Sequence, residues 1–175
     1  VRQRIDQIEY FIKNPLDIQQ EVFKNLISSA KNTEWGKKHH YSSIKNINEY
    51  KSRVALQDYD SLKPYINRIM NGEQNILWNS EINWFAKSSG TTSDKSKFIP
   101  VSKEALEDCH FKGGKDLMSI YCNNNPDTQI FAGKGLIMGG SSQINQFNPN
   151  SFFGDVSAVM LSNMPFVASL LHTPD

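Results

Sequence analysis

A hydroxyl-rich segment with a single glycine holds the residues of this chain whose types and spacing could do chemistry. The segment covers residues 87–97 and reads KSSGTTSDKSK. Backbone N–H groups in a turn of this kind can form a concave surface that binds anions, and Lys97 can add a point charge to it. The segment therefore predicts a polyphosphate-binding loop. The same residue types also make up ordinary exposed loops, so a solvated loop is the alternative.

The spacing of this segment excludes two common phosphate-binding motifs. The P-loop requires a glycine at a fixed distance before its GK[ST] signature, and no glycine stands there. The dinucleotide fingerprint requires three glycines, and Gly90 is the one glycine in the segment.

Short apolar stretches flank the hydroxyl-rich segment on both sides. The aromatic content of residues 82–86 predicts a strand, and residues 98–101 predict a second strand that Pro100 stops. The loop would then follow the carboxyl end of a strand, which is the sheet edge where α/β proteins bind ligands. Ser102 is a suitable N-cap for a helix from residue 103 to about 121. We expect Gly113 and Gly114 to interrupt this helix and to mark close packing.

Apolar residues at helical spacing predict two helices in the first 30 residues, separated at Asn14–Pro15. We interpret them as a helical hairpin. The buried stripe of the second helix would consist of Leu16, Val22, Phe23, Leu26 and Ile27.

The rest of the chain predicts shorter elements. Residues 32–45 read as a basic, aromatic loop anchored by Trp35, and residues 46–54 and 59–71 read as two short helices, with Gly72 ending the second. Further on, residues 128–132 and 136–138 are strand candidates, and residues 164–171 a last helix. The stretch 143–151 is rich in Asn and Gln but is too short to be low-complexity sequence. We expect the carboxylate of Asp155 to cap the turn that follows it rather than to bind a metal.

The composition limits the classes of partner. Nineteen basic and eighteen acidic side chains give a formal charge of +1, whereas nucleic acids and anionic membranes favour clustered positive charge. No apolar run approaches the ~20 residues that span a bilayer, and the first residues are charged where a signal peptide is apolar. Cys109 and Cys122 stand alone, and the four histidines do not show metal-ligand spacing. We therefore expect a cytoplasmic protein without a metal site in its own side chains, bound to neither nucleic acid nor membrane.

The hydroxyl-rich segment resembles the phosphate-binding loop of the adenylate-forming superfamily, which includes acyl-CoA synthetases and luciferases. That superfamily usually has glycine where Ser93 stands and reaches its lysine one residue sooner than Lys97. The longer spacing and the continuation to Pro100 resemble the auxin-responsive acyl-acid amido synthetase family and its bacterial members. Other stretches resemble this family in the same order along the chain, namely residues 32–36, 41–44, 58–66, 69–73, 133–136 and 154–159.

This resemblance implies an α/β fold. The chain would be the N-terminal portion of the large domain of an adenylate-forming enzyme, with a helical hairpin followed by a mixed sheet and flanking helices. Residues 1–75 would be mainly helical, and residues 76–175 would form the α/β part with the phosphate loop. Members of the family are far longer, so we expect a partial domain of a longer protein that is catalytically incomplete by itself.

The resemblance also implies an activity and its residues. The whole protein would be an ATP-dependent ligase that adenylates a small carboxylic acid and passes the acyl group to an amine or amino acid, with ATP and Mg²⁺ as cofactors. Lys97 would be the catalytic residue, and the phosphates would contact Ser88, Ser89, Gly90, Thr91, Thr92, Ser93 and Lys97. Plant relatives often carry an arginine on the helix after the loop, and residues 103–122 contain none, so plant-hormone substrates are not implied. The alternatives are a ligase that forms a coenzyme A thioester and a non-catalytic nucleotide-binding or scaffold module.

Overall fold

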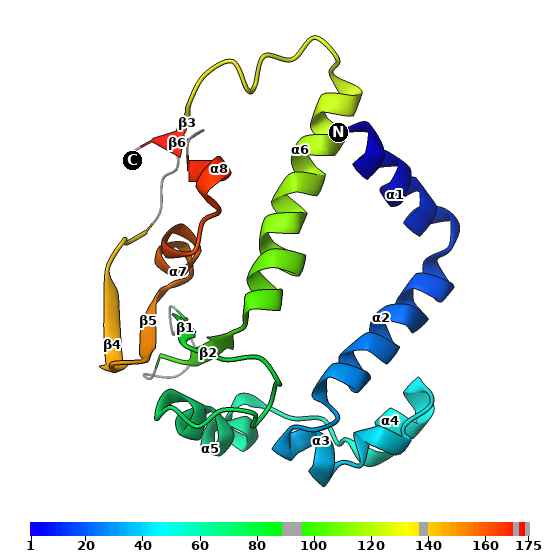
Figure 1. Ribbon diagram of the computed structural model, residues 1–175, viewed down its shortest axis with the longest axis vertical. Coiled ribbons are helices and arrows are strands. Elements are labelled where there is room, and N and C mark those ends of the chain that lie inside the picture. Colours follow the sequence, from blue (N-terminus) through cyan, green and yellow to red (C-terminus); the bar gives the residue numbers. More distant parts are fainter. Residues whose placement is uncertain (89–95, 137–139, 170–171, 174–175) are drawn as a thin grey trace.

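The computed structural model describes residues 1–88, 96–136, 140–169 and 172–173, and these form a mixed α/β structure (Figure 1). The helical elements are α1 (Arg2–Lys13), α2 (Pro15–Ala30), α3 (Glu34–Lys38), the 3₁₀ turn η1 (Tyr41–Ser43), α4 (Ile47–Arg53), α5 (Tyr59–Met70), the π-helical segment η2 (Ala105–Phe111), α6 (Lys112–Asn124), α7 (Val156–Ser162) and α8 (Phe166–Ser169). The strands are β1 (Trp84–Lys87), β2 (Phe98–Val101), β3 (Gly135–Leu136), β4 (Ile144–Asn148), β5 (Ser151–Asp155) and β6 (His172–Thr173). The α/β class is confirmed.

A four-stranded mixed sheet positions the predicted loop. Its strand order is β2-β1-β5-β4, with β1 parallel to β5 and both outer pairs antiparallel. Because successive strand residues point to opposite faces, Phe85 and Ala86 of β1 enter two different cores. Phe85 packs with Ile69 of α5, whereas Ala86 packs with Val159 of α7 and with η2. Helices therefore cover both faces of the strand that precedes the loop.

Strands β4 and β5 come from a region to which the sequence assigned no element. Three of the five residues of β4 are Asn or Gln. The ring of Phe147, however, lies at centroid distances of 5.8, 5.0 and 4.2 Å from the rings of Phe85, Phe98 and Phe153. This aromatic cluster stabilises the packing of an Asn- and Gln-rich strand in the sheet, because aromatic pairs across strands contribute to sheet stability.

The first two helices end and begin at the predicted residues but are arranged differently from a hairpin. Asn14 joins α1 and α2 at an open bend, and α1 lies beside α6 (Figure 1). Arg4 of α1 binds both carboxylate oxygens of Asp116 on α6, with 2.7 Å between Nη2 and Oδ2. The predicted buried stripe of α2 is correct only at Ile27 and, in part, Phe23, whereas Leu16 is 79% exposed. Val22 and Leu26 of the predicted stripe are also exposed.

The predicted basic loop of residues 32–45 contains two short helical elements, α3 and η1. Thr33 caps α3, since its hydroxyl accepts a hydrogen bond from the Gly36 N–H at 2.9 Å and donates one to the Ala30 carbonyl at 2.7 Å. A Cβ at Gly36 would lie 2.0 Å from that carbonyl oxygen, so close approach explains the glycine. Trp35 is buried and donates to the hydroxyl of Tyr41 at 3.1 Å, which confirms it as the anchor.

The helix after β2 differs from its prediction at the glycine pair. Ser102 accepts a hydrogen bond from the Ala105 N–H at 3.1 Å, as expected for a cap. The helix then continues as η2 and α6 to Asn124, through both Gly113 and Gly114. Apart from the helix's own backbone, no atom of the described residues lies within 4 Å of a Cβ built at either glycine, so the expected close packing is wrong.

Two further expectations change. Residues 128–132 form turns rather than a strand, with Ala132 N–H bonded to the Gln129 carbonyl at 2.8 Å. The last predicted helix begins later than expected, at Phe166 of α8, and its predicted residues 170 and 171 lie outside the described residues. Cys109 and Cys122 are unpaired, as expected. Among the described helices, none has the length and apolar content needed to cross a bilayer.

Candidate functional site

The ends of the predicted phosphate loop are held together at the edge of the sheet. Residues Lys87 and Phe98 are partners in the antiparallel β1–β2 pair. Beyond them, the Ser88 N–H donates to the Lys97 carbonyl at 2.9 Å, and the Lys97 N–H donates to the Ser88 hydroxyl at 3.1 Å. Ser88 and Lys97, two of the predicted site residues, are therefore joined by a reciprocal pair of hydrogen bonds. Ser89, Gly90, Thr91, Thr92 and Ser93 lie outside the described residues.

The loop leaves the sheet at the carboxyl end of its parallel pair. Lys87 of β1 lies in register with Asp155 of β5, and Ala86 lies opposite Gly154. A Cβ at Gly154 would lie 2.8 Å from the Gln143 carbonyl oxygen, so the close approach of the Gln143 backbone requires glycine at this position. The carboxyl ends of parallel strands are where open α/β sheets bind ligands. The base of the loop thus has the position that the sequence predicted.

Asp155 does not have its predicted role. It is the N-cap residue of α7, but its side chain makes no capping hydrogen bond. Its side chain is exposed at the same sheet edge, and a Cβ at Gly140 would lie 3.9 Å from its Oδ2. The carboxylate therefore faces solvent beside the loop base rather than satisfying the helix terminus.

Lys97 is exposed at the loop's end, next to α5. Its ammonium nitrogen lies 5.4 Å from the ring centroid of Tyr59, within the range of a cation–π contact. Asp58, the N-cap of α5, is nearby. Hydrogen bonds from the Ser61 N–H and hydroxyl hold the pKa of Asp58 below its usual value, and the charge of Lys97 lowers this pKa further. The lysine therefore has an aromatic and an acidic neighbour on one element.

Tyr59 is a residue of this site that the sequence did not single out. Its hydroxyl accepts a hydrogen bond from the Phe98 N–H at 2.9 Å and lies 3.3 Å from the Phe98 carbonyl, to which it donates. Tyr59 and Phe98 are 39 positions apart. No local pattern signals such a pairing, because it arises only when α5 packs beside β2.

One carboxylate near the site has hydrogen-bond partners that are structural. Glu104, just after the Ser102 cap, accepts hydrogen bonds from the indole of Trp78 at 3.2 Å and the hydroxyl of Ser80 at 2.8 Å. These bonds tie the start of the helix to the segment that precedes β1. The segment before β1 and the helix after β2, which flank the loop and its two strands in the sequence, are therefore hydrogen-bonded to each other.

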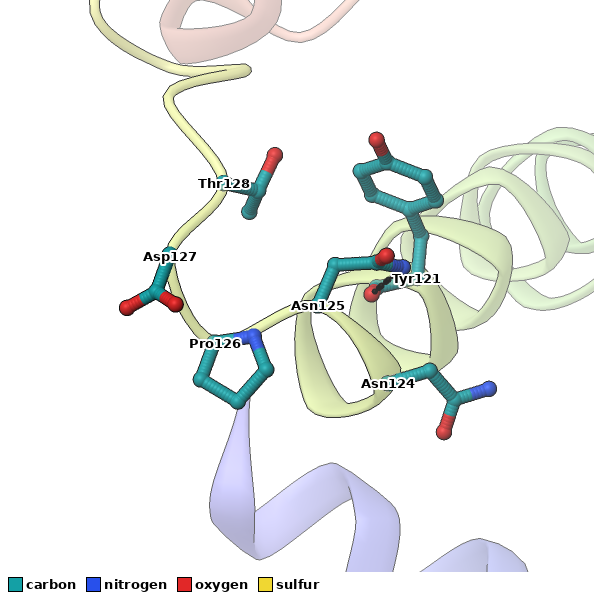
Figure 2. A pocket seen from close by; sticks show the side chains of 6 residues that line it. All are labelled: Tyr121, Asn124, Asn125, Pro126, Asp127 and Thr128. Carbon is teal, nitrogen blue, oxygen red and sulfur yellow. Dashed lines mark hydrogen bonds between the residues drawn. The ribbon is translucent and has the colours of Figure 1, made fainter.

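One surface depression lies well away from the loop. It is at the C-terminal end of α6, whereas β1 and β2 lie near the opposite end of the helical run formed by η2 and α6 (Figure 1). Figure 2 shows its open lining of amide, carboxylate and ring groups, with the Asp127 carboxylate directed outward. Its lining residues are Tyr121, Asn124, Asn125, Pro126, Asp127 and Thr128. A second depression, at the N-terminus of α5, is lined by Leu56, Gln57, Asp58 and Ser61 and adjoins the Tyr59 contacts.

Metal ligands are sparse in this part of the molecule. Within the described ranges, no group of three or more His, Cys, Asp or Glu side chains is placed to hold an ion. Magnesium that accompanies a nucleotide needs only one or two carboxylates, because phosphate oxygens and water supply its other ligands. The exposed Asp155 carboxylate at the loop edge fits that requirement.

Comparison with known proteins gives a consistent set of relatives. A family model described as "GH3 family N-terminal domain" matches residues 4–174. The chain is 34% identical over 101 residues to "Indole-3-acetic acid-amido synthetase GH3.2" of Arabidopsis thaliana, covering 57% of this chain and 18% of that protein. It is 27% identical over 164 residues to "Jasmonoyl--L-amino acid synthetase JAR6" of Nicotiana attenuata, covering 85% of this chain and 27% of that protein.

The fold also has a solved counterpart. The structure of "GH3.15 acyl acid amido synthetase" superimposes with a TM-score of 0.75 at 21% identity, covering 97% of this chain and 29% of that one. At this identity the likeness shows the fold alone. The chain spans less than a third of the length of each of these proteins.

Proposed function

The chain belongs to the GH3 family, and from this membership we propose that it is the N-terminal part of an ATP-dependent acyl-acid amido synthetase. The whole protein would join a small carboxylic acid to an amine or amino acid. Support comes from the family match over residues 4–174 and from relatives named as an indole-3-acetic acid-amido synthetase and a jasmonoyl–L-amino acid synthetase. We also propose that residues 1–75 and 76–175 are the helical and α/β parts of one incomplete domain.

The observation that carries this proposal is the closed loop base at the carboxyl edge of the parallel β1–β5 pair. The reciprocal Ser88–Lys97 hydrogen bonds fix where the loop starts and ends, and Lys97 is exposed there. We propose that the triphosphate of ATP binds at this loop, with phosphate contacts from Ser88, Ser89, Gly90, Thr91, Thr92, Ser93 and Lys97.

The chemistry has two steps. A carboxylate oxygen of the acid attacks the α-phosphorus of ATP, the bond to the bridging oxygen breaks, and pyrophosphate leaves with that oxygen. The amine nitrogen then attacks the acyl carbon, the bond to the adenylate oxygen breaks, and AMP leaves while the nitrogen loses a proton. The first barrier is electrostatic because one anion approaches another, so held phosphates and a fixed cation lower it.

The residues of this chain would contribute binding and charge to the first step. Lys97 would neutralise the charge that develops on the departing phosphates, and the Ser88 hydroxyl would orient them. Mg²⁺, when bound, supplies further charge neutralisation on the phosphate oxygens. Asp155 is the carboxylate that this edge offers to hold the ion.

Two finer assignments belong to the same proposal. The unpaired Cys109 and Cys122 fit a reducing compartment, which supports the cytoplasm as the place of action. The absence of arginine from residues 103–122 argues for an acid other than the plant hormones named for the relatives.

Acid-dependent exchange of labelled pyrophosphate into ATP, measured on the full-length protein over a panel of carboxylic acids, tests the proposal. We expect Lys97→Ala to reduce the exchange rate about a hundredfold, because it removes one preorganised cation from the transition state. Lys103→Ala is the matched control, since Lys103 is an exposed lysine 3.8 Å from Glu107 and away from the loop base.

Two outcomes would contradict the proposal. One is a wild-type protein that shows no exchange with any acid in the panel. The other is equal exchange by the Lys97→Ala and Lys103→Ala variants. Product analysis with an amine mixture and with coenzyme A then separates an amide ligase from a thioester ligase.

A further inference from the structure

We infer that Tyr59 is the positioning residue of the phosphate loop: it holds the backbone at the loop's C-terminal end through its hydroxyl and the Lys97 ammonium through its ring. The inference rests on the proposed function, because it concerns the same nucleotide site. It adds a residue from outside the loop, 38 positions before Lys97 in the sequence.

The backbone part of the inference follows from the place of β2 in the sheet. Among the described strands β2 is at the edge of the sheet, so the backbone groups on its outer side face no strand of that set. The single hydroxyl of Tyr59 accepts from the Phe98 N–H at 2.9 Å and donates to the Phe98 carbonyl at 3.3 Å, in a partly buried setting. Both backbone groups of the first residue of β2 are therefore bound by one side chain, and the Lys97 Cα is fixed next to it.

The side-chain part follows from the ring of the same residue. The Lys97 ammonium nitrogen is 5.4 Å from the Tyr59 ring centroid. Lysine has a long, flexible side chain, and the exposed backbone position of Lys97 would otherwise leave it many conformations. Contact with the ring face restricts the ammonium to the α5 side of the loop base, which lowers the entropy cost of presenting it to a phosphate.

Tyr59 is itself held in place by the start of α5. It is the first residue of this helix, directly after the N-cap Asp58, whose carboxylate accepts from the Ser61 N–H at 2.8 Å. The Ser61 hydroxyl in turn accepts from the Asp58 N–H at 3.1 Å, which completes a capping box. The ring and hydroxyl of Tyr59 thus act from a rigid helix terminus.

The test uses titration calorimetry of Mg-ATP into the full-length protein, together with the KM for ATP and for the carboxylic acid in pyrophosphate exchange. Tyr59→Phe keeps the ring and removes the two backbone hydrogen bonds, so we expect ATP to bind about three- to tenfold more weakly. Tyr59→Leu removes the ring as well and should weaken ATP binding about tenfold or more. The KM for the acid should stay within twofold in both variants.

The chain offers a matched control on the same helix. Tyr65 of α5 also has a lysine over its ring, with the Lys38 ammonium nitrogen at 5.3 Å from the centroid and 2.7 Å from the hydroxyl. Tyr65→Phe removes a comparable hydroxyl contact away from the loop. We expect it to leave the affinity for Mg-ATP unchanged.

A double-mutant cycle with Lys97→Ala separates positioning from general stabilisation. The difference in ATP affinity between Tyr59→Leu and Tyr59→Phe measures the effect of the ring. If the ring acts through Lys97, this difference disappears when both variants also carry Lys97→Ala. An equal fold-loss in both backgrounds would overturn the inference, because a purely structural residue gives additive effects.

The remaining outcomes separate this inference from the proposed function. Wild-type protein that binds Mg-ATP without acid-dependent exchange refutes the ligase, while the titrations still decide the role of Tyr59. Tyr59→Leu with wild-type affinity for Mg-ATP overturns the inference even if exchange is normal. Wild-type protein that does not bind Mg-ATP refutes both.

Discussion

At the scale of single residues, the candidate site depends on side-chain hydroxyls that bind backbone groups. The Ser88 hydroxyl accepts from the Lys97 N–H, and the Tyr59 hydroxyl binds both backbone groups of Phe98. Trp35 and Tyr41 form a similar pair in the helical part, where the indole donates to the phenol at 3.1 Å. Such shared hydroxyls bind groups that would otherwise be unpaired, and unpaired groups in partly buried positions are costly.

Tyr41 gives a prediction of pH dependence. Burial of its ring is the largest cause that raises the pKa of Tyr41 to about 12. In the unfolded chain this group ionises near 10, so between about pH 10 and 12 the unfolded state binds fewer protons than the folded state and stability falls as pH rises. We expect a loss of up to about 1.4 kcal/mol per pH unit in this window, measured by urea unfolding at a series of pH values.

The control for this prediction is Tyr41→Phe. It should lower stability at neutral pH through loss of the indole contact, and it should flatten the decline between pH 10 and 12. An unchanged decline in the variant would assign the effect to other groups. Absorbance at 295 nm gives a direct check, since the tyrosinate signal that the Tyr41→Phe variant lacks should appear in the wild-type protein at about pH 12.

At the scale of elements, glycine positions show which elements approach one another closely. At Gly36 the α2 terminus and α3 come so near that a Cβ would meet the Ala30 carbonyl oxygen at 2.0 Å. A Cβ at Gly113 or Gly114 in α6 would meet no atom within 4 Å from another element of the described structure. The first glycine is required by packing, whereas the other two leave one side of α6 open.

We therefore predict opposite effects of two chemically identical substitutions in the 175-residue chain. Gly36→Ala should destabilise it by about 1–3 kcal/mol, because the added methyl group meets a backbone atom that cannot move freely. Gly113→Ala should stabilise it by about 0.5–1 kcal/mol through helix propensity alone. Urea unfolding at one pH measures both, and destabilisation by Gly113→Ala would show that α6 packs against another element at this position.

At the scale of the whole molecule, this chain exposes more surface to solvent than a compact monomer of its mass. Its accessible surface is 12109 Å², whereas a folded monomer of its mass exposes about 8,700 Å². Large apolar side chains are exposed on neighbouring helices, including Ile12 at 72% on α1, Leu16 at 79% on α2 and Leu117 at 69% on α6. None of the residues of α1 is buried, and Arg4 connects this helix to Asp116 of α6. An open surface of this kind fits a chain that spans less than a third of its relatives.

The surface predicts how the 175-residue chain behaves alone. We expect it to bind the dye 8-anilinonaphthalene-1-sulfonate, since large exposed apolar patches bind such dyes. We also expect the 175-residue chain to show no acid-dependent pyrophosphate exchange. The full-length protein should bind several-fold less dye per molecule. Equal dye binding by both would mean that the rest of the protein leaves these helices uncovered.

Several elements were predictable from sequence because their signals are local. The bounds of α1 and α2 followed from apolar spacing and the Asn14–Pro15 break. Gly72, whose φ is +99°, lies just after α5, which ends at Met70 with Asn71 as its C-cap. Strands β1 and β2 were predictable because a polar segment separates two apolar ones, and Ser88 and Lys97 are the residues that directly follow β1 and precede β2. The family resemblance, carried by ordered short stretches, is confirmed over residues 4–174.

Other features depend on which distant segments meet. The burial of α2 was overestimated because an apolar stripe shows a helix that can be covered, without showing what covers it. Strand β4 was missed because its mostly polar sequence does not show a strand pattern. Its one aromatic residue, Phe147, packs against the sheet only in the folded structure. The sequence by itself determined the helix breaks, the loop and its lysine, since each is fixed by neighbours along the chain. Only the tertiary structure placed Tyr59 against Phe98 and Lys97, because a hydrogen bond across 39 positions exists only after α5 and the sheet edge have packed together.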